Sequence, residues 1–282
     1  MSPRSRAKED PTRLQTGVSG TARGEVGRRR DGSGGQVKSA DRILAIFEYL
    51  AAHRDASFGS IAADLDLPNS SAYQLLQTAL RKGFLELDPE SRRYLIGIRL
   101  WEVAQAYPIA ATLVALAQPL MDDLADRTME TVQLARLDGL ENVYLAIAES
   151  PHPMKLVSKV GGRLPAHATG LGKALLAGLS DDELASRLKG VHLGSFTDKT
   201  ISDRNQLVAE ISRVRASGFS EDNEEYIIGC RCVAAPVHDR SSRTIAAMSV
   251  SVPTPRYSEE VARSTRTALL DTVRQLEKQI AG

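Results

Sequence analysis

Uncharged polar side chains suited to contacting DNA bases are concentrated between Asn69 and Thr78. Asn and Gln can pair bidentately with adenine, and Ser can contact several base edges. Two arginines further along the chain suit phosphate contacts, which position a protein on DNA without specifying sequence. The predicted DNA-binding residues are Asn69, Ser70, Ser71, Tyr73, Gln74, Gln77, Arg92 and Arg93. A solvated polar face on a small helical module would use the same residue types, and that alternative stays open at this point.

A glycine-rich segment in the second half of the chain could offer backbone N–H groups to an anion. Its Gly170-Leu171-Gly172-Lys173 pattern is not a phosphate-binding P-loop, which needs a further upstream glycine and a Ser or Thr after the lysine, where Ala174 stands. What remains is a turn leading into a helix, whose free N–H groups suit a carboxylate. A tight turn that needs glycine for backbone reasons alone is the alternative.

Cys230 and Cys232 raise the question of metal or redox chemistry, since side chains two apart on a strand point to the same side. A zinc site needs four ligands at recognisable spacings, and the histidines form no paired motif. Buried thiols are the simpler interpretation, so we expect no metal and no cofactor. The sequence also contains neither a Gly-x-Ser-x-Gly elbow nor a His-Glu-x-x-His motif. We therefore do not expect an enzyme.

The polar segment must be positioned by a helical region. Apolar residues at helical spacing predict helices near 39–52, 58–65 and 70–82, with Pro68 before the third helix and Gly83 after it. Two short alternating runs, 84–87 and 92–96, flank a proline-containing turn and predict a β-hairpin. Three helices followed by a hairpin predict a winged helix-turn-helix, whose third helix enters the major groove.

The remainder of the chain mixes strand-like and helical segments, which predicts an α+β domain. A long helical connector, divided or kinked at Pro108, leads into it. Asp138-Gly139 predicts a hairpin between the first two strands. The predicted strands are 132–137, 143–148, 155–160, 232–237 and 244–252, and the predicted helices are 172–179, 181–188, 203–217 and 258–281.

Charge is uneven along the chain, although the net charge is only +1. Met1 to Lys38 contain nine basic and four acidic residues and few large apolar ones, so residues 1–37 are predicted to be a disordered basic tail. Such a tail could contact phosphates or simply be solvated. The sequence has no run of about 18 apolar residues and no signal-peptide core, so no membrane span is expected. Two cysteines and no export signal favour a cytoplasmic protein.

The DNA-binding half resembles the IclR family of transcriptional regulators. The resemblance is carried by Val37–Leu44, Leu67–Tyr73, Leu75–Thr78, Gly83–Glu86 and Tyr94–Gly97. It implies a sequence-specific regulator, more often a repressor, that binds a palindromic double-stranded operator as a homodimer or a dimer of dimers. One position departs from the family, which often carries Arg where Gln74 stands. Losing that charge should favour a different operator.

The second half resembles the effector domain of the same family, which has a GAF-like fold. Residues 161–177, 218–237 and 246–253 carry this resemblance. It implies that a small-molecule effector, a carboxylate or an aromatic metabolite, binds between the sheet and the loops. By match of position, the effector-binding residues would be Met154, Leu156, Gly170, Leu171, Asp222, Cys232, Ser249 and Ser251. Core packing is the alternative for each of them.

The expected organisation is a tail at 1–37, a winged helix-turn-helix at 38–98, a helical connector and dimerisation segment at 99–112, and an effector-binding domain at 113–282. Ligand binding would change the spacing of the DNA-binding heads through different affinities for two states. Three alternatives stay open. They are a ligand-binding module that docks proteins, an enzyme acting on the same ligand, and a constitutive DNA binder with a degenerate pocket.

Overall fold

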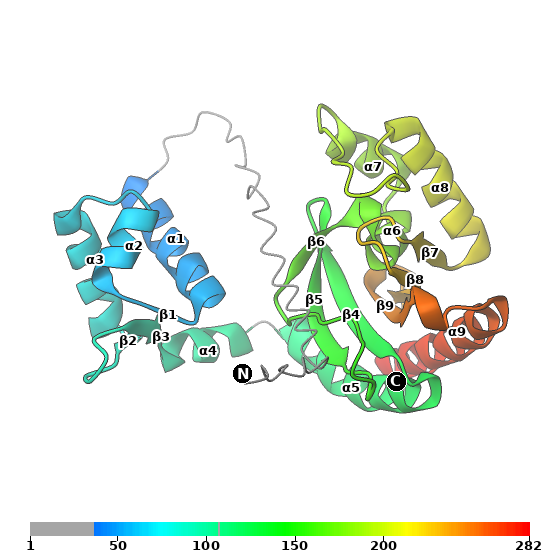
Figure 1. Cartoon of the computed structure of the whole chain (residues 1–282), viewed down its shortest axis with the longest axis horizontal. Coiled ribbons are helices and arrows are strands. Elements are labelled where there is room, and N and C mark those ends of the chain that lie inside the picture. The colour runs from blue at the N-terminus through cyan, green and yellow to red at the C-terminus, as the bar shows by residue number, and fades with distance from the viewer. Residues whose placement is uncertain (1–36, 107) are drawn as a thin grey trace, which may run out of the picture. The chain divides into compact units, whose positions relative to one another are not determined.

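The computed structural model describes residues 37–106 and 108–282, so the predicted basic tail lies outside the described residues apart from Val37. The chain divides into two compact units, one ending at Leu100 and the other beginning at Trp101 (Figure 1). None of the described helices is long and apolar enough to cross a membrane.

The first unit confirms the predicted helices and hairpin. Its elements are α1 (Lys38–His53), β1 (Asp55–Ala56), α2 (Phe58–Asp64), α3 (Asn69–Arg81), β2 (Leu85–Leu87) and β3 (Tyr94–Ile96), and α4 (Ile98–Gln105) follows. The three strands form a small sheet in the order β1-β3-β2. Its core contains Ile46, Leu50, Ile61, Leu76 and Leu85, which are at most 1% exposed. The predicted helical stripes therefore meet in one core.

Side-chain hydrogen bonds to backbone N–H groups define the start of α2 and the turn between β2 and β3. Ser57 caps α2 by accepting a hydrogen bond from the backbone N–H of Ser60 at 3.1 Å. The hairpin turn is held by Asp88, whose carboxylate accepts hydrogen bonds from the backbone N–H groups of Glu90 and Ser91 at 2.9 and 2.7 Å. Arg92 then adopts a left-handed conformation, with φ at 57°. This turn stabilises the β2–β3 hairpin, which we call the wing.

The second unit is a six-stranded antiparallel sheet with helices on both faces, in the order β6-β5-β4-β9-β8-β7. Helices α5 and α9 pack on one face of the sheet and α6 packs on the other (Figure 1). Helix α8 packs against α6. The strands are β4 (Thr131–Asp138), β5 (Glu141–Ala148), β6 (Arg163–Pro165), β7 (Ser220–Asn223), β8 (Cys230–His238) and β9 (Thr244–Pro253). The helices are α5 (Pro108–Thr128), α6 (Gly170–Ala177), α7 (Asp181–Leu188), α8 (Arg204–Ser217) and α9 (Glu259–Ala281), with short 3-10 turns at Ala166–Ala168 and Thr254–Arg256.

Alternation along the central strands separates an apolar face from a polar one. On β9, Met248 and Val250 enter the core beneath α5 and α9, while Ser249 and Ser251 point to the opposite side. Gln133 on β4 pairs in register with Ser249, and Cys232 on β8 pairs with Ser251. The polar side chains of the second unit are therefore gathered on the α6 side of the sheet.

One expectation about the second unit was wrong. No strand forms at 155–160, where the chain runs as a loop from residue 149 to 162, and Val157 and Val160 are exposed. The edge strand that pairs with β5 is instead the short β6. The acidic segment before β8 begins as an edge strand, β7, because its backbone pairs with β8.

Candidate functional sites

Helix α3 presents most of the predicted DNA-contacting side chains to solvent. Asn69, Ser70, Tyr73 and Gln74 are exposed, with Tyr73 at 56%. Ser71 and Gln77 are half-buried. The structure adds a residue of α1 that sequence reasoning missed, because Arg42 donates from Nη1 to the Ser71 hydroxyl at 3.1 Å. No local pattern signals this contact, which joins residues 29 apart.

The two wing arginines differ in their surroundings. Arg92 is exposed at the tip of the turn. Arg93 forms an ion pair with Asp55 through Nε and donates from Nη2 to the Asp55 carbonyl at 3.2 Å. Such an exposed pair contributes about 0–1 kcal/mol, but it offsets part of the charge that Arg93 would offer a phosphate. Of the two, Arg92 is better placed for backbone contacts.

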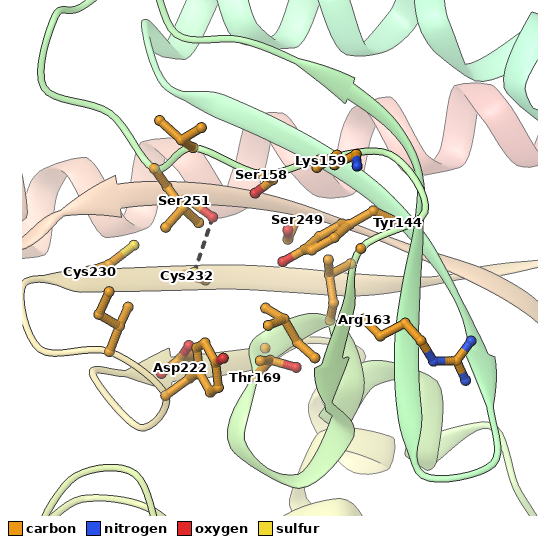
Figure 2. A pocket seen from close by; sticks show the side chains of 18 residues that line it. Tyr144, Ser158, Lys159, Arg163, Thr169, Asp222, Cys230, Cys232, Ser249 and Ser251 are labelled. Carbon is orange, nitrogen blue, oxygen red and sulfur yellow. Dashed lines mark hydrogen bonds between the residues drawn. The ribbon is translucent and has the colours of Figure 1, made fainter. Parts of the chain in front are cut away.

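A cavity of 260 Å³ lies over the polar face of the second unit's sheet (Figure 2). Its walls are that face, the start of α6, the 149–162 loop and the loop after β7. Seven of the eight predicted effector-binding residues line it: Leu156, Gly170, Leu171, Asp222, Cys232, Ser249 and Ser251. Met154 does not line it. Its side chain is 55% exposed, and its carbonyl accepts a hydrogen bond from Arg256 at 3.0 Å.

The start of α6 gives the cavity a set of backbone donors. Thr169 caps the helix by accepting from the N–H of Gly172 at 3.1 Å, so Gly170 and Leu171 hold the first two helical positions. N–H groups at such positions have no carbonyl partner within the helix. Gly172 is required sterically, because a Cβ there would lie 2.2 Å from backbone atoms of Ala166. The glycine-rich segment is thus a close-packed turn whose first two helical residues line the cavity.

The sheet face contributes hydroxyl groups to the cavity. The hydroxyls of Ser249 and Ser251 donate to Oε1 of Gln133 at 2.9 and 3.0 Å, so toward any other partner they can act only as acceptors. Gln133 is fully buried and donates from Nε2 to Ser158 at 3.4 Å. Sequence reasoning missed Gln133, although its place in an otherwise apolar strand was a usable signal.

Asp222 is the acidic group of the cavity, and it is 5% exposed. Burial raises its pKa to about 7, and the nearby carboxylate of Glu225 adds to the increase. Lys173 and a hydrogen bond from the backbone N–H of Glu225, at 2.8 Å, act in the opposite direction. Lys173 is itself buried between Glu225 at 2.6 Å and Glu210 at 3.3 Å. A buried charge network therefore supports the loop behind Asp222.

The cavity lining contains further residues that were not predicted to bind an effector. Tyr144, Val157 and Ile227 supply apolar surface, and Arg163 lies at the edge, paired with Asp138 and Glu141. The remaining lining residues are Ser158, Lys159, Gly162, Leu164, Thr169, Tyr226 and Cys230. Among the described residues, no three His, Cys, Asp or Glu side chains are grouped as a metal site would require.

Comparison with known proteins identifies the domains that carry both candidate sites. The chain matches the IclR helix-turn-helix domain over residues 39–89 and the C-terminal domain of bacterial IclR transcriptional regulators over residues 105–278. It is 32% identical to the HTH-type transcriptional regulator KdgR of Escherichia coli, over 86% of this chain and 93% of that protein. It is 31% identical to the transcriptional repressor IclR of Escherichia coli, over 80% and 84% of the two chains.

Solved structures show the same architecture. The IclR protein of Thermotoga maritima superposes with a TM-score of 0.71 at 27% identity, over 88% of this chain and all of that one. An IclR homologue from Microbacterium hydrocarbonoxydans, crystallised with 4-hydroxybenzoate, superposes with a TM-score of 0.76 at 25% identity, over 86% and 97%. With a helix-turn-helix domain and an effector domain both matched, the chain belongs to the IclR family of transcriptional regulators, whose members are not enzymes.

Proposed function

We propose that this regulator is a repressor whose operator binding is modulated by a small hydroxylated carboxylate held in the cavity. The observation that carries the proposal is the mixed polarity of the cavity lining. The lining includes the first two residues of α6, Gly170 and Leu171, whose N–H groups can donate, and the hydroxyls of Ser249 and Ser251, which can accept. A ligand that carries a carboxylate and a hydroxyl could pair the carboxylate with these N–H groups and the hydroxyl with the serines.

The size of the cavity supports a compact ligand. A cavity of about 150 Å³ lined by apolar side chains is large enough for benzene, so 260 Å³ admits one substituted ring or a short aliphatic chain. Leu156, Val157 and Ile227 provide the apolar contacts that such a body needs. The relative crystallised with 4-hydroxybenzoate makes that compound the first one to test.

On the DNA side, we propose that α3 contacts bases through Asn69, Ser70, Tyr73 and Gln74 and that Arg92 contacts the backbone. Two copies would bind a palindrome as a homodimer or dimer of dimers, with 99–112 as connector between the DNA-binding domain at 38–98 and the effector domain at 113–282. The basic tail would add salt-dependent phosphate contacts. The place of action would be the cytoplasm, where the operator is.

The test begins with selection of genomic DNA fragments that bind the full-length protein, followed by fluorescence anisotropy on the selected operator. Addition of 4-hydroxybenzoate, or of another small carboxylate from a panel, should change operator affinity by about 5–150-fold, the usual range of allosteric coupling. The neutral analogue 4-hydroxybenzyl alcohol is the matched control and should act only at much higher concentration.

Each alternative gives a different result in this experiment. A protein-docking module would select no DNA, an enzyme would consume the ligand during incubation, and a constitutive binder would show no response to any carboxylate. If no carboxylate in the panel changes operator affinity while DNA binding is intact, the ligand class proposed here is wrong.

A further inference from the structure

Two thiols lie side by side on one wall of the cavity. Cys230 and Cys232 stand two positions apart on β8, and both line the cavity (Figure 2). The Cys232 sulfur is 3.2 Å from the Ser251 hydroxyl, and neither cysteine is in a disulfide. These are the only two cysteines of the chain, so any reagent that needs two thiols has one possible site.

The surroundings of Cys232 disfavour its thiolate form. A hydrogen bond with Cys230 and burial both raise the pKa of the Cys232 thiol. Alkylating agents and peroxides react with the thiolate, so a protonated, buried thiol reacts slowly with them. Trivalent arsenic compounds differ, because a thiol condenses with an arsenic-bound hydroxyl and gives its proton to the departing water.

Geometry also disfavours a disulfide here and favours a longer bridge. Residues two apart on a strand are separated by about 6.6–6.8 Å between Cα atoms, which is the upper limit of about 4.4–6.8 Å seen for disulfides. Closing an S–S bond would require β8 to contract while it is paired on both sides with β7 and β9. Inserting one atom between the two sulfurs removes that requirement.

We propose that Cys230 and Cys232 form a dithiol site for trivalent organoarsenic compounds, with the organic substituent seated in the apolar part of the cavity. In the reaction of R–As(OH)₂ with two thiols, two As–S bonds form and two As–O bonds break. Two water molecules leave with the thiol protons, and arsenic stays trivalent. Three-coordinate arsenic needs only two protein ligands, since R is the third, and Val157 and Ile227 would contact R.

The probe is phenylarsine oxide, added to the full-length protein and followed by intact mass spectrometry with thiol counting in denaturant. The expected product is one phenylarsenic group per chain with both thiols lost, while iodoacetamide modifies the folded protein slowly. Cys230→Ser and Cys232→Ser each leave one thiol and should not hold the group against a competing dithiol. Ser251→Ala leaves both thiols and should still form the adduct.

Comparison with the unfolded chain separates a built site from simple proximity in sequence. The folded protein should retain the phenylarsenic group at a concentration of competing 2,3-dimercaptopropanol at least tenfold higher than the urea-unfolded chain does. Inorganic arsenite, which lacks the organic group, should be held less tightly than the phenyl compound. Equal or tighter retention by the unfolded chain, or no adduct with the folded protein, would overturn the proposal. Neither readout uses DNA, so the result is independent of the proposed regulation.

Discussion

Replacing Asp222 by Asn should stabilise the effector domain, and the gain should depend on pH. Asp222 is buried, with its pKa raised to about 7 by burial and by the carboxylates of Glu225 and Glu224, against the opposing effect of Lys173. An acid whose pKa is higher in the folded state favours folding only while it is protonated. Its contribution therefore declines as pH rises from the unfolded value of 3.8 to about 7 and is constant above that.

The size of the stability change follows from the shift in the pKa of Asp222. One pKa unit corresponds to about 1.36 kcal/mol, so ionising Asp222 costs about 4 kcal/mol at pH 8 and little at pH 4. Asn is neutral at every pH, and its side-chain oxygen can still accept the hydrogen bond from the backbone N–H of Glu225. At roughly 2–4 °C per kcal/mol for a domain of this size, the variant should melt about ten degrees above the parent at pH 8.

Differential scanning calorimetry from about pH 4 to pH 8 resolves this, with the effector domain followed as its own transition. Asp239→Asn is an opposite-sign control, because hydrogen bonds from Arg243 lower the pKa of Asp239. Relative to the parent, that variant should show a loss of stability that grows as pH rises to the unfolded value of 3.8 and then stays constant up to pH 8. A melting difference between Asp222→Asn and the parent that is the same at pH 4 and pH 8 would refute the assignment of a protonated, buried Asp222.

Three further predictions concern single positions. Gly172→Ala should destabilise the effector domain by about 1–3 kcal/mol, because its Cβ would meet the backbone of Ala166, and urea unfolding should show this loss. Arg92→Ala should lower the slope of log affinity for the operator against log salt concentration by about one ion. Arg93→Ala should lower this slope less, because Asp55 already pairs with Arg93. Equal slopes for the two variants would contradict the different roles given to the two arginines. Gln133→Met removes the acceptor of both serine hydroxyls, so these hydroxyls become free to donate. The preference for 4-hydroxybenzoate over benzoate, measured by calorimetric titration, should then fall by about fivefold, which corresponds to the free energy of one hydrogen bond. An unchanged preference would show that Gln133 does not set the polarity of that wall.

Helix positions and the sheet's polar face were predictable because they follow from short-range periodicity. Ala72, Leu76 and Ala79 are buried on α3 as their spacing requires. Ser249 and Ser251 share a face because they are two apart on a strand. The resemblance placed these residues in a pocket, which spacing alone could not do, since a polar strand face can also be solvated.

Contacts between distant segments were not predictable. Gln133 meets Ser249 across 116 residues, and Lys173 meets Glu225 across 52. Neither pairing leaves a local pattern in the sequence. The failed strand at 155–160 has a related cause, since apolar alternation cannot show whether a partner strand is available. Val157 alternates like a strand residue but lines the cavity from a loop.

Binding of an acid at the start of α6 is central to the proposed regulation, and Gly170 allows a direct test. Gly170→Pro removes one donor N–H at the first helical position, where proline is well accepted, and Thr169 before it already has the extended conformation that proline requires, with ψ at 148°. Gly170→Ala is the matched control. It keeps the N–H, and its added Cβ makes only ordinary contacts of 3.5–3.7 Å.

The measurement is operator affinity in both variants as the active carboxylate is titrated, starting with 4-hydroxybenzoate. A hydrogen bond to a charged group contributes about 1.5–3 kcal/mol. We therefore expect Gly170→Ala to respond like the parent and Gly170→Pro to need about 10–150-fold more ligand. If both variants bind the operator and respond at the same ligand concentration, the acid does not bind at the start of α6.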